Sequence, residues 1–440
     1  MFGIKHISSS VELVEVCLSE ETAMKTRSRK PWMMSVAAVL ASLGVATAAS
    51  AETVTLWTLN FDNSAANAAL KKVASEFEAF NPGTKVEIVQ RAVDEHKTAL
   101  RVAAGSNKGP DIYFSWAGLG LGGEYVKAGL SAPLDKYYTE YSWADELLPS
   151  AAAFADLYPG GKHGVPFTFK GEAVYYNKQL LAKAGVADEP KSYEEFLAAA
   201  EKLKAAGIPA FTFGGSVNWH VMRLMDVILE TKCGAEKHDA LKSMKADWSQ
   251  EPCATEAFGE FGKWTKDYML QPFMGIDNKQ SFSLFKAGRA AMMLEGDWLV
   301  GQLKTSGANL DDYGIFPFPT NTQRLYGFAE YNYISTKSPH PDLAAKFLDY
   351  LLSSKVQQDT VGQFSSASVN KNVQYANQLP LQAEWLDVFK TYGKVYMNGD
   401  QAFPLDVTTE YFRVINGVAA GDVAPADAAK QLQTFIAGRT

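Results

Sequence analysis

Tryptophans beside small and polar residues are the features of this sequence that point most directly to chemistry. Trp116 precedes Ala-Gly, Trp219 stands between an asparagine and a histidine, and Trp298 follows Glu-Gly-Asp. A neutral saccharide offers apolar C–H faces and a rim of hydroxyls, so its site needs flat aromatic surfaces and side chains that make paired hydrogen bonds. Ordinary core packing is the competing interpretation, and it suits Trp57, which lies inside a β-rich run. We expect Trp219 and Trp298 to be exposed in a cleft.

Motifs for catalysis or metal binding are absent from the sequence. The six histidines show no pairing at metal-ligand spacing, and H-E-x-x-H, G-x-S-x-G and Walker patterns do not occur. The carboxylate pair of a glycosidase meets only in space, so a secreted carbohydrate-active enzyme stays open as an alternative.

A glycine-rich segment matches the spacing of a dinucleotide-binding loop. Gly118, Gly120 and Gly123 follow the strand-like run DIYFS and precede a helical pattern. That run is the third predicted strand of its sheet, whereas the dinucleotide motif follows the first. We therefore interpret the segment as a flexible turn between a strand and a helix.

Length and charge narrow the class of protein further. The chain has 440 residues, which is long for one core and predicts two domains or more. Its 42 basic and 49 acidic residues give a net charge of −7. Binding to nucleic acid or to an anionic membrane needs a basic surface, so we expect neither partner.

The N-terminus reads as a signal peptide that covers residues 1–51. Four basic residues lie between positions 25 and 30, an apolar run covers 33–45, and Ala-Ser-Ala at 49–51 is a cleavage site. The apolar run is short for a membrane anchor, which is the alternative. Because four glutamates precede the basic residues, Met24 is a possible true start. We expect Sec-type export and a periplasmic location.

Two cysteines remain after this leader. In an oxidising compartment Cys233 and Cys253 are predicted to form a disulfide that closes a local loop. A metal pair is the alternative, and only His238 lies between them as a further ligand.

Strand and helix patterns alternate along the mature chain, which predicts an α/β fold with parallel strands and a ligand crevice beyond their carboxyl ends. The first predicted elements are a strand over 53–59, a helix from Ser64 with Leu70, Val73, Phe77 and Phe80 on one face, a strand over 85–90, a helix capped by Asp94 and ending at Ala104, and a strand over 111–115. Further on we predict a strand over 173–176, a helix from a capping box at Ser192 to Ala206, a strand over 210–213, mostly helix over 218–312, strands over 313–316 and 331–335, a helix over 341–352 and a helical tail over 381–436.

The order of several segments resembles bacterial extracellular solute-binding proteins of family 1, the carbohydrate type that includes maltose-binding-protein-like receptors of ABC importers. These segments include LKKVASEFEAFNPGTKVEI, GPDIYFSW, GVPFTFKGEAVYYNKQLLAKAGV, SYEEFLAAAEKL, FKAGRAAMMLEGDWLV, GIFPFPT and PHPDLAAKFLDYLLS. Any one of these segments is weak evidence for the family, but their shared order across residues 52–440 is specific to it.

The resemblance implies a two-lobed periplasmic-binding-protein fold of type II, hinged by chain crossings near 165–175, 316–327 and 366–373. The N-lobe would comprise 52–165 plus 320–368, and the C-lobe 166–319 plus 369–440.

The resemblance also implies which residues bind the ligand. Where the family often has a carboxylate after its third strand, this chain has Ser115-Trp116, which suggests stacking there. The implied site residues are Asn60, Phe61, Asp62, Arg91, Asp94, Trp116, Lys170, Glu172, Asn218, Trp219, Gly296, Asp297, Trp298, Glu330 and Tyr331.

The function that follows is capture without chemistry. We expect a monomer that takes a neutral mono- or oligosaccharide by hinge closure and delivers it to a membrane permease, with no cofactor and no metal. The alternatives of the same fold are receptors for glycerol 3-phosphate, a polyamine or an acidic sugar. An anionic ligand needs converging cations, and only Arg91, Lys170 and Arg223 look available.

Overall fold

The computed structural model describes residues 51–439, except Asp62, Asn377 and Gly393. The predicted signal peptide lies outside the described residues apart from Ala51. All described residues belong to one compact unit, Ala49–Thr440. Among them, no helix is both long enough and apolar enough to cross a membrane.

The described strands form a single mixed sheet in the order β2-β1-β3-β7-β4-β5, with β6 beside β4 and β8 beside β7. The predicted parallel arrangement holds for β1 with β2 and with β3. From β3 to β7, β4 and β5 the pairing is antiparallel. The strands are β1 (Glu52–Leu59), β2 (Thr84–Arg91), β3 (Ile112–Trp116), β4 (Val165–Asn177), β5 (Met292–Gly296), β6 (Tyr313–Phe316), β7 (Leu325–Ile334) and β8 (Val395–Met397).

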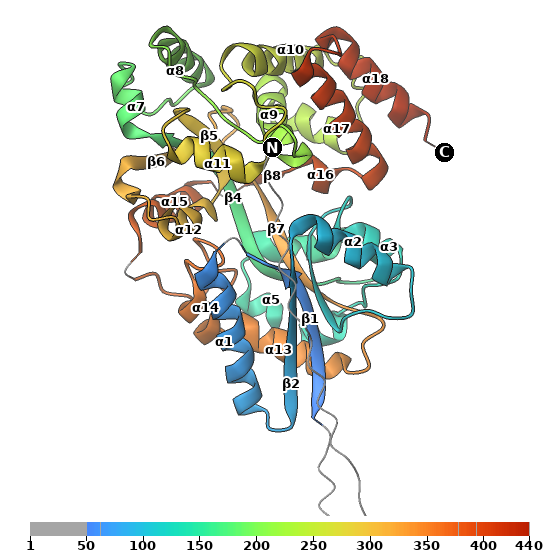
Figure 1. Cartoon of the computed structure of the whole chain (residues 1–440). Coiled ribbons are helices and arrows are strands. Elements are labelled where there is room, and N and C mark those ends of the chain that lie inside the picture. The colour runs from blue at the N-terminus through green and yellow to red at the C-terminus, as the bar shows by residue number, and fades with distance from the viewer. Residues whose placement is uncertain (1–50, 62, 377, 393, 440) are drawn as a thin grey trace, which may run out of the picture. The chain divides into compact units, whose positions relative to one another are not determined.

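The two longest strands join the halves of this sheet. Val165 at the start of β4 pairs with Asn332 of β7, and Glu172 pairs both with Tyr326 of β7 and with Gly296 of β5. Figure 1 shows β4 and β7 running from the side of β1 and β2 to the side of α9 and α10. Polar residues near the middle of these strands therefore lie where the two halves meet.

Helices cover both halves of the sheet. The half with β1, β2 and β3 carries α1 (Ser64–Phe80), α2 (Val93–Ala104), α3 (Gly122–Lys127), α4 (Asp135–Glu140), α5 (Trp143–Glu146), α6 (Pro149–Ala152), the 3₁₀ turn η1 (Ala153–Leu157), α13 (Pro341–Leu352) and α14 (Ser354–Thr360). The other half carries α7 (Lys178–Lys183), α8 (Tyr193–Ala205), α9 (Asn218–Lys242), α10 (Pro252–Asp267), α11 (Asn278–Lys286), α12 (Leu299–Thr305), the 3₁₀ turn η2 (Leu310–Asp312), α15 (Pro380–Thr391), α16 (Gly399–Ala402), α17 (Leu405–Ala420) and α18 (Pro425–Ala437).

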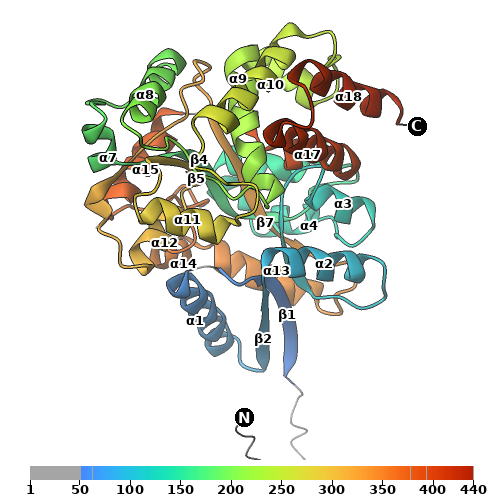
Figure 2. The same ribbon diagram turned by 45° about the horizontal axis from the view of Figure 1, so that its top comes forward.

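The buried apolar residues form three clusters. The first core joins α1 and α13 to the β1–β3 half and includes Phe77 and Phe347. The second core joins α8, α9, α10, α17 and α18 and includes Trp264 and Tyr411. Figure 2 shows α17 beside α18, at the opposite end of the described residues from α1. The third core, around Trp385, packs α12 and α15 against β4 to β6.

The predicted periodicity of α1 matches its buried face. Leu70, Val73 and Phe77 are buried, and the side chain of Asn63 caps the helix by accepting from two backbone N–H groups. Phe80 is 70% exposed because it is the last residue of the helix, where its ring lies at the edge of the packing and contacts Tyr350. The amphipathic pattern therefore predicted the buried face except at its end.

Two predictions of secondary structure were wrong, and one strand was missed. Asp94 does not cap α2, because the helix already begins at Val93 and Asp94 lies in its first turn. Residues 210–213 form no strand, since only Phe211 makes isolated bridges, to residues 269 and 292. β5 lies inside the region predicted as mostly helical, because a short apolar run has the same pattern in a strand and in a buried helix.

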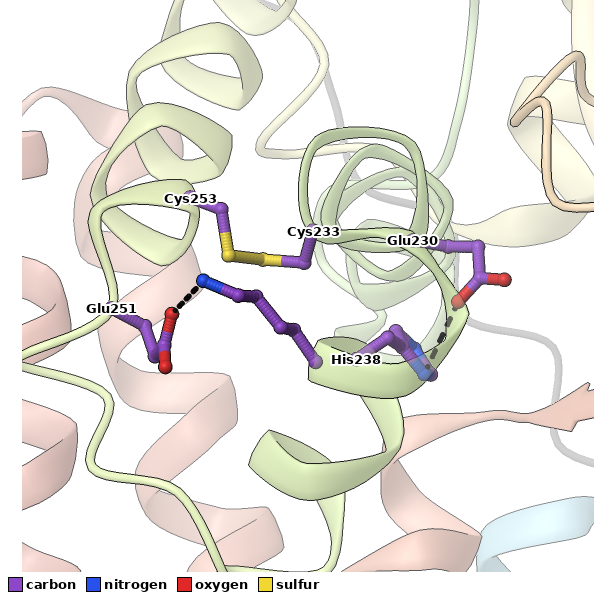
Figure 3. Close-up of a disulfide and its surroundings, with 6 residues drawn as sticks. Glu230, Cys233, His238, Glu251 and Cys253 are labelled. Carbon is purple, nitrogen blue, oxygen red and sulfur yellow. Dashed lines mark hydrogen bonds and ion pairs between the residues drawn. A yellow bond between two sulfur atoms is a disulfide. The ribbon is translucent and has the colours of Figure 1, made fainter.

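The predicted disulfide is confirmed. Cys233 of α9 bonds to Cys253 at the start of α10, which leaves no free thiol pair for a metal (Figure 3). Gly234 interrupts α9 beside the bond with a φ of 71°, a conformation that suits glycine. His238 lies near Glu230, with Nδ1 3.3 Å from Oε2. The disulfide therefore links α9 covalently to α10 at the edge of the second core.

Removing this bond should lower stability through the entropy of the unfolded chain. The double variant Cys233→Ser/Cys253→Ser is expected to lose about 3 kcal/mol of unfolding free energy, the cost of freeing a loop of this size. Urea unfolding followed by circular dichroism measures the difference. Reductant serves as the control, since it should destabilise the wild type and leave the variant unchanged. Equal stability of oxidised wild type and variant would contradict the prediction.

Candidate ligand-binding site

A cavity of about 190 Å³ lies between the first and second cores. Its apolar lining consists of Leu59, Phe61, Ala66, Val93, Trp116, Trp219, Trp298, Phe328 and Phe364. Its polar lining consists of Asn60, Asn63, Lys97, Lys170, Arg223, Asn278, Gln302, Glu330, Gln363, Asn398, Asp400 and Gln401. The cavity therefore combines aromatic surfaces with amides and charged groups.

Three half-buried tryptophans lie on different elements around the cavity. Trp116 ends β3 beside the first core, Trp219 lies in the first turn of α9, and Trp298 directly precedes α12. The ring of Trp298 lies 5.8 Å from that of Phe328 on β7, centroid to centroid. A flat ligand can thus stack on rings that belong to both sides of the cavity.

Arg223 is the centre of a buried ion cluster beside two of these rings. Its guanidinium carbon lies 4.5 Å from the centre of the Trp219 ring and 5.1 Å from that of Trp298. The same guanidinium pairs with Glu172, and its Nη1 lies 2.7 Å from Oε2 of Glu295. The positive charge is therefore compensated by two carboxylates, and the cation holds both indole rings in place.

The two carboxylates of this cluster titrate differently. Burial raises the pKa of Glu172 to about 7, although Arg223 opposes the shift. For Glu295 burial acts in the same direction, but Arg223 and His220 prevail and lower its pKa to about 2. Nε2 of His220 lies 2.8 Å from Oε1 of Glu295, and burial lowers the pKa of this histidine. Glu295 therefore stays ionised, whereas Glu172 changes charge near neutral pH.

Lys170, in the middle of β4, is the centre of a second cluster. It donates to the carbonyl oxygen of Phe364, and its Nζ lies 3.9 Å from Asp297 and 3.8 Å from Glu330. Asp297 also accepts from the Ser365 hydroxyl at 2.7 Å and from the backbone N–H of the next residue. Lys170 is therefore a compensated cation that ties β4 to β7 and to the loop after α14.

The segment at α16 presents acceptors that the chain leaves open. Oδ1 of Asn398, Oδ1 of Asp400 and Oε1 of Gln401 are buried and make no hydrogen bond to any described residue. All three residues line the cavity. Burial raises the pKa of Asp400, and Lys97 across the cavity opposes that shift. Buried acceptors without partners in the chain are suited to donors from a ligand or from water.

Seven of the residues implied by the resemblance line the cavity: Asn60, Phe61, Trp116, Lys170, Trp219, Trp298 and Glu330. Three more lie directly behind this lining: Glu172 beside Arg223, Asp297 beside Lys170, and Gly296, which the Trp298 ring covers. Asp62 lies outside the described residues.

Four implied residues are not part of the cavity lining. Arg91 stacks on the Trp57 ring at 4.2 Å, and Asp94 lies in the first turn of α2. Asn218 accepts a hydrogen bond from Asn416 at 2.7 Å. Tyr331 donates to a backbone carbonyl inside the first core.

Several lining residues were missed because they cap, lie on or follow a helix, where polar residues are common on any solvated surface. Among them are Asn63, which caps α1, Lys97 on α2, and Gln363 after α14. The segment 398–401 carries a usable signal, since Asn-Gly-Asp interrupts the predicted helical tail. Arg223, named above only as an available cation, lies at the centre of the site.

Comparison with known families decides the class of protein. The model of the bacterial extracellular solute-binding protein family matches residues 62–358. The chain belongs to this family. A relative from Pyrococcus abyssi named maltotriose-binding protein is 28% identical over 290 residues, which are 64% of this chain and 58% of that protein. The multiple sugar-binding protein of Streptococcus mutans is 23% identical over 333 residues, 72% of this chain and 75% of that protein.

Solved structures agree on the fold. A chitin oligosaccharide binding protein superposes with a TM-score of 0.78 at 22% identity, covering 87% of this chain and 97% of that one. A solute-binding protein solved with raffinose gives a TM-score of 0.70 at 19% identity, covering 87% and 98%. The predicted two-lobed fold of type II is therefore confirmed.

The raised pKa of Glu172 makes stability depend on pH. Because its pKa of about 7 in the folded chain exceeds the ordinary 4.5, the folded chain keeps a proton that the unfolded chain loses between these values. The contribution of Glu172 to stability therefore falls as pH rises through this window. The variant Glu172→Gln should gain about 2 kcal/mol relative to wild type between pH 5.5 and pH 8.

Urea unfolding of both proteins at the two pH values measures this gain. Glu87→Gln, on the exposed side of β2, controls for the loss of one charge. A difference between Glu172→Gln and wild type that stays constant across pH would refute the assignment.

Proposed function

We propose that this chain is the substrate-binding component of an ABC sugar importer. It binds a neutral mono- or oligosaccharide in the cavity and delivers it to a membrane permease. The observation that carries the proposal is the set of half-buried tryptophans on several elements, interspersed with open hydrogen-bond acceptors. The relatives whose names specify maltotriose or multiple sugars support the same ligand class.

The charges around the cavity favour a neutral ligand. Arg223 already pairs with two carboxylates, Lys170 lies between two more, and Lys97 lines the same cavity as Asp400. A phosphate or a uronate would have to displace one of these buried carboxylates, which leaves that carboxylate without its cation at a high desolvation cost. A polyamine would compete with the cations in the same way. Sugar hydroxyls need no such exchange.

The proposed mechanism is capture by closure of two lobes. The N-lobe comprises 52–165 plus 320–368, and the C-lobe 166–319 plus 369–440. Nearly all members of the first core fall in the proposed N-lobe; the exceptions are Phe167, Phe169 and Val369, close to its boundaries. All members of the second core fall in the proposed C-lobe except Tyr326 of β7. This distribution supports the division. A ligand that contacts both walls binds the closed form more tightly and so shifts the population towards it.

The proposal assigns the chain no reaction. It acts as a monomer outside the cytoplasm, exported by the predicted signal peptide, and needs no cofactor or metal. The relatives named above are binding proteins, which supports the absence of a reaction, and the family is extracellular, which supports a location outside the cytoplasm. The closed form docks on the permease, whose ATPase supplies the energy for import.

A ligand screen tests the proposed class of ligand. Neutral mono-, di- and trisaccharides should include one that raises the melting temperature, because a ligand at 100 times its Kd stabilises by about 2.7 kcal/mol. Glycerol 3-phosphate, spermidine and glucuronate are the charged comparators, and isothermal calorimetry gives the affinity of each hit. Binding of a charged comparator in preference to every neutral sugar would overturn the neutral class, and cleavage of a bound oligosaccharide would overturn the assignment as a receptor.

Loss of one stacking surface tests the site. Trp298→Ala is expected to weaken binding of the best sugar by at least about 1 kcal/mol, since an aromatic platform is removed. The matched control is Trp57→Ala, because Trp57 is also half-buried and contacts Arg91 but does not line the cavity. Calorimetry should show near-wild-type affinity for the control. Equal affinities of both variants would remove Trp298 from the site.

A further inference from the structure

The glycine-rich turn after β3 meets the segment at α16 on the opposite side of the cavity. The backbone N–H of Leu119 donates to the carbonyl oxygen of Gln401 at 2.7 Å. Ala117, two residues before Leu119, belongs to the first core, and Phe403, two residues after Gln401, belongs to the second. This contact therefore joins the two cores directly, in addition to the strands β4 and β7 that also join them.

Two glycines make this approach possible. A Cβ at Gly118 would lie within 3.0 Å of backbone atoms of Gln401, and a Cβ at Gly120 within 3.0 Å of the carbonyl oxygens of Asp400 and Phe403. Real Cβ atoms essentially never come so close to backbone. Any larger residue at these positions would therefore hold the two segments apart.

Each side of the contact is anchored in its own half. The N–H of Gly118 donates to the hydroxyl of Tyr158 at 2.8 Å, and that hydroxyl lies 3.0 Å from the hydroxyl of Tyr333. On the other side, the N–H of Gly399 donates to Oδ2 of the buried Asp226 at 2.7 Å. Asp226 also pairs with a buried lysine and accepts from two tyrosine hydroxyls. The two segments therefore move with their cores rather than independently.

The same α16 segment faces the cavity. Asp400 is 8% exposed, and its Oδ1, like Oε1 of Gln401, makes no hydrogen bond within the described part of the chain. Both residues line the cavity, and their backbone carbonyls face the glycine turn. The same short segment therefore borders the cavity and contacts the turn.

We propose that residues 398–403 couple ligand recognition to closure: Asp400 and Gln401 accept hydrogen bonds from ligand hydroxyls, and the carbonyl groups of this segment clasp the turn Gly118–Gly120. The inference rests on the proposed function, since it assumes a hydroxyl-rich ligand. It adds that Asp400 determines specificity and that the two glycines set how far the lobes close. A ligand that engages Asp400 aligns the carbonyls with the turn, so occupancy and closure support each other.

Gly120→Ala tests the clasp. The backbone of Gly120 lies outside the left-handed region, so alanine meets no conformational obstacle there and only the contact is disturbed. We expect at least tenfold weaker binding of the best sugar and loss of the compaction that this sugar causes in small-angle scattering. Gly259→Ala is the matched control, because its Cβ would point into open space on α10 and should change neither measurement.

Hydrogen–deuterium exchange of the peptide 117–123 reports on the clasp itself. In wild type the sugar should slow this exchange, and in Gly120→Ala it should not, while the variant melts at the wild-type temperature without ligand. If Gly120→Ala fails to fold, the wild-type measurement alone decides whether the clasp exists: slower exchange of 117–123 with sugar supports it. Unchanged affinity and scattering in Gly120→Ala, or no slowing in the wild type, would overturn the clasp and leave the sugar receptor standing.

Asp400→Asn tests the recognition arm separately. Asparagine keeps the size of the side chain but replaces one acceptor oxygen by a donor, so affinity for the best sugar should fall at least tenfold with the ligand-free exchange of 117–123 unchanged. Wild-type affinity in this variant would overturn the role of Asp400.

If no sugar binds the wild type, the proposed function fails. The clasp is then judged by the exchange of 117–123 without ligand. Faster exchange in Gly120→Ala than in wild type supports the clasp, and equal rates overturn it.

Discussion

The buried pairing of Arg223 with Glu172 and Glu295 is the interaction on which the rest of the site depends. Taking these groups out of water is costly, and only their mutual attraction and hydrogen bonds offset that cost. The carboxylates come from β4 and β5, adjacent strands in the sheet, whereas the guanidinium comes from α9. The cluster therefore fixes α9 against the sheet, and with it the indole of Trp219, while the same guanidinium also contacts the ring of Trp298. Because two carboxylates compensate the cation, the cluster holds the aromatic surfaces rigidly and presents little net charge to a ligand.

A second constraint is the continuity of β4 and β7. Both strands are buried almost throughout and pass from one core to the other without a break in pairing, apart from one irregularity near Pro166. Lys170 and Glu330 lie on these strands beneath the cavity. Any relative motion of the lobes must bend or twist this two-stranded connection, so the floor of the cavity stays ordered while its walls move. The contact of Leu119 with Gln401 is a further link between the two cores, and it is made by backbone atoms alone.

Much of this fold could be predicted from local pattern, and much of the site could not. Periodicity located α1 and α13 because their apolar residues repeat at helical spacing and pack against a sheet. The same reasoning missed β5, whose apolar run has no alternation. Trp219 and Trp298 could be chosen as cavity candidates from their small and polar neighbours, and both line the cavity. The Asn-Gly-Asp break marks the segment of Asp400, but it does not show that the tertiary fold buries this carboxylate without a partner for Oδ1.

The two interleaved cores have a consequence for how the chain acquires its structure. The first core combines residues before 170 with residues 329–369, and the second needs helices as late as α18. Neither can be completed while the ribosome or a translocation channel still holds the last third of the polypeptide. Contacts between such distant segments slow folding and leave apolar surface exposed for longer. The bond between Cys233 and Cys253 is local by comparison, so it can form while both cores are still incomplete.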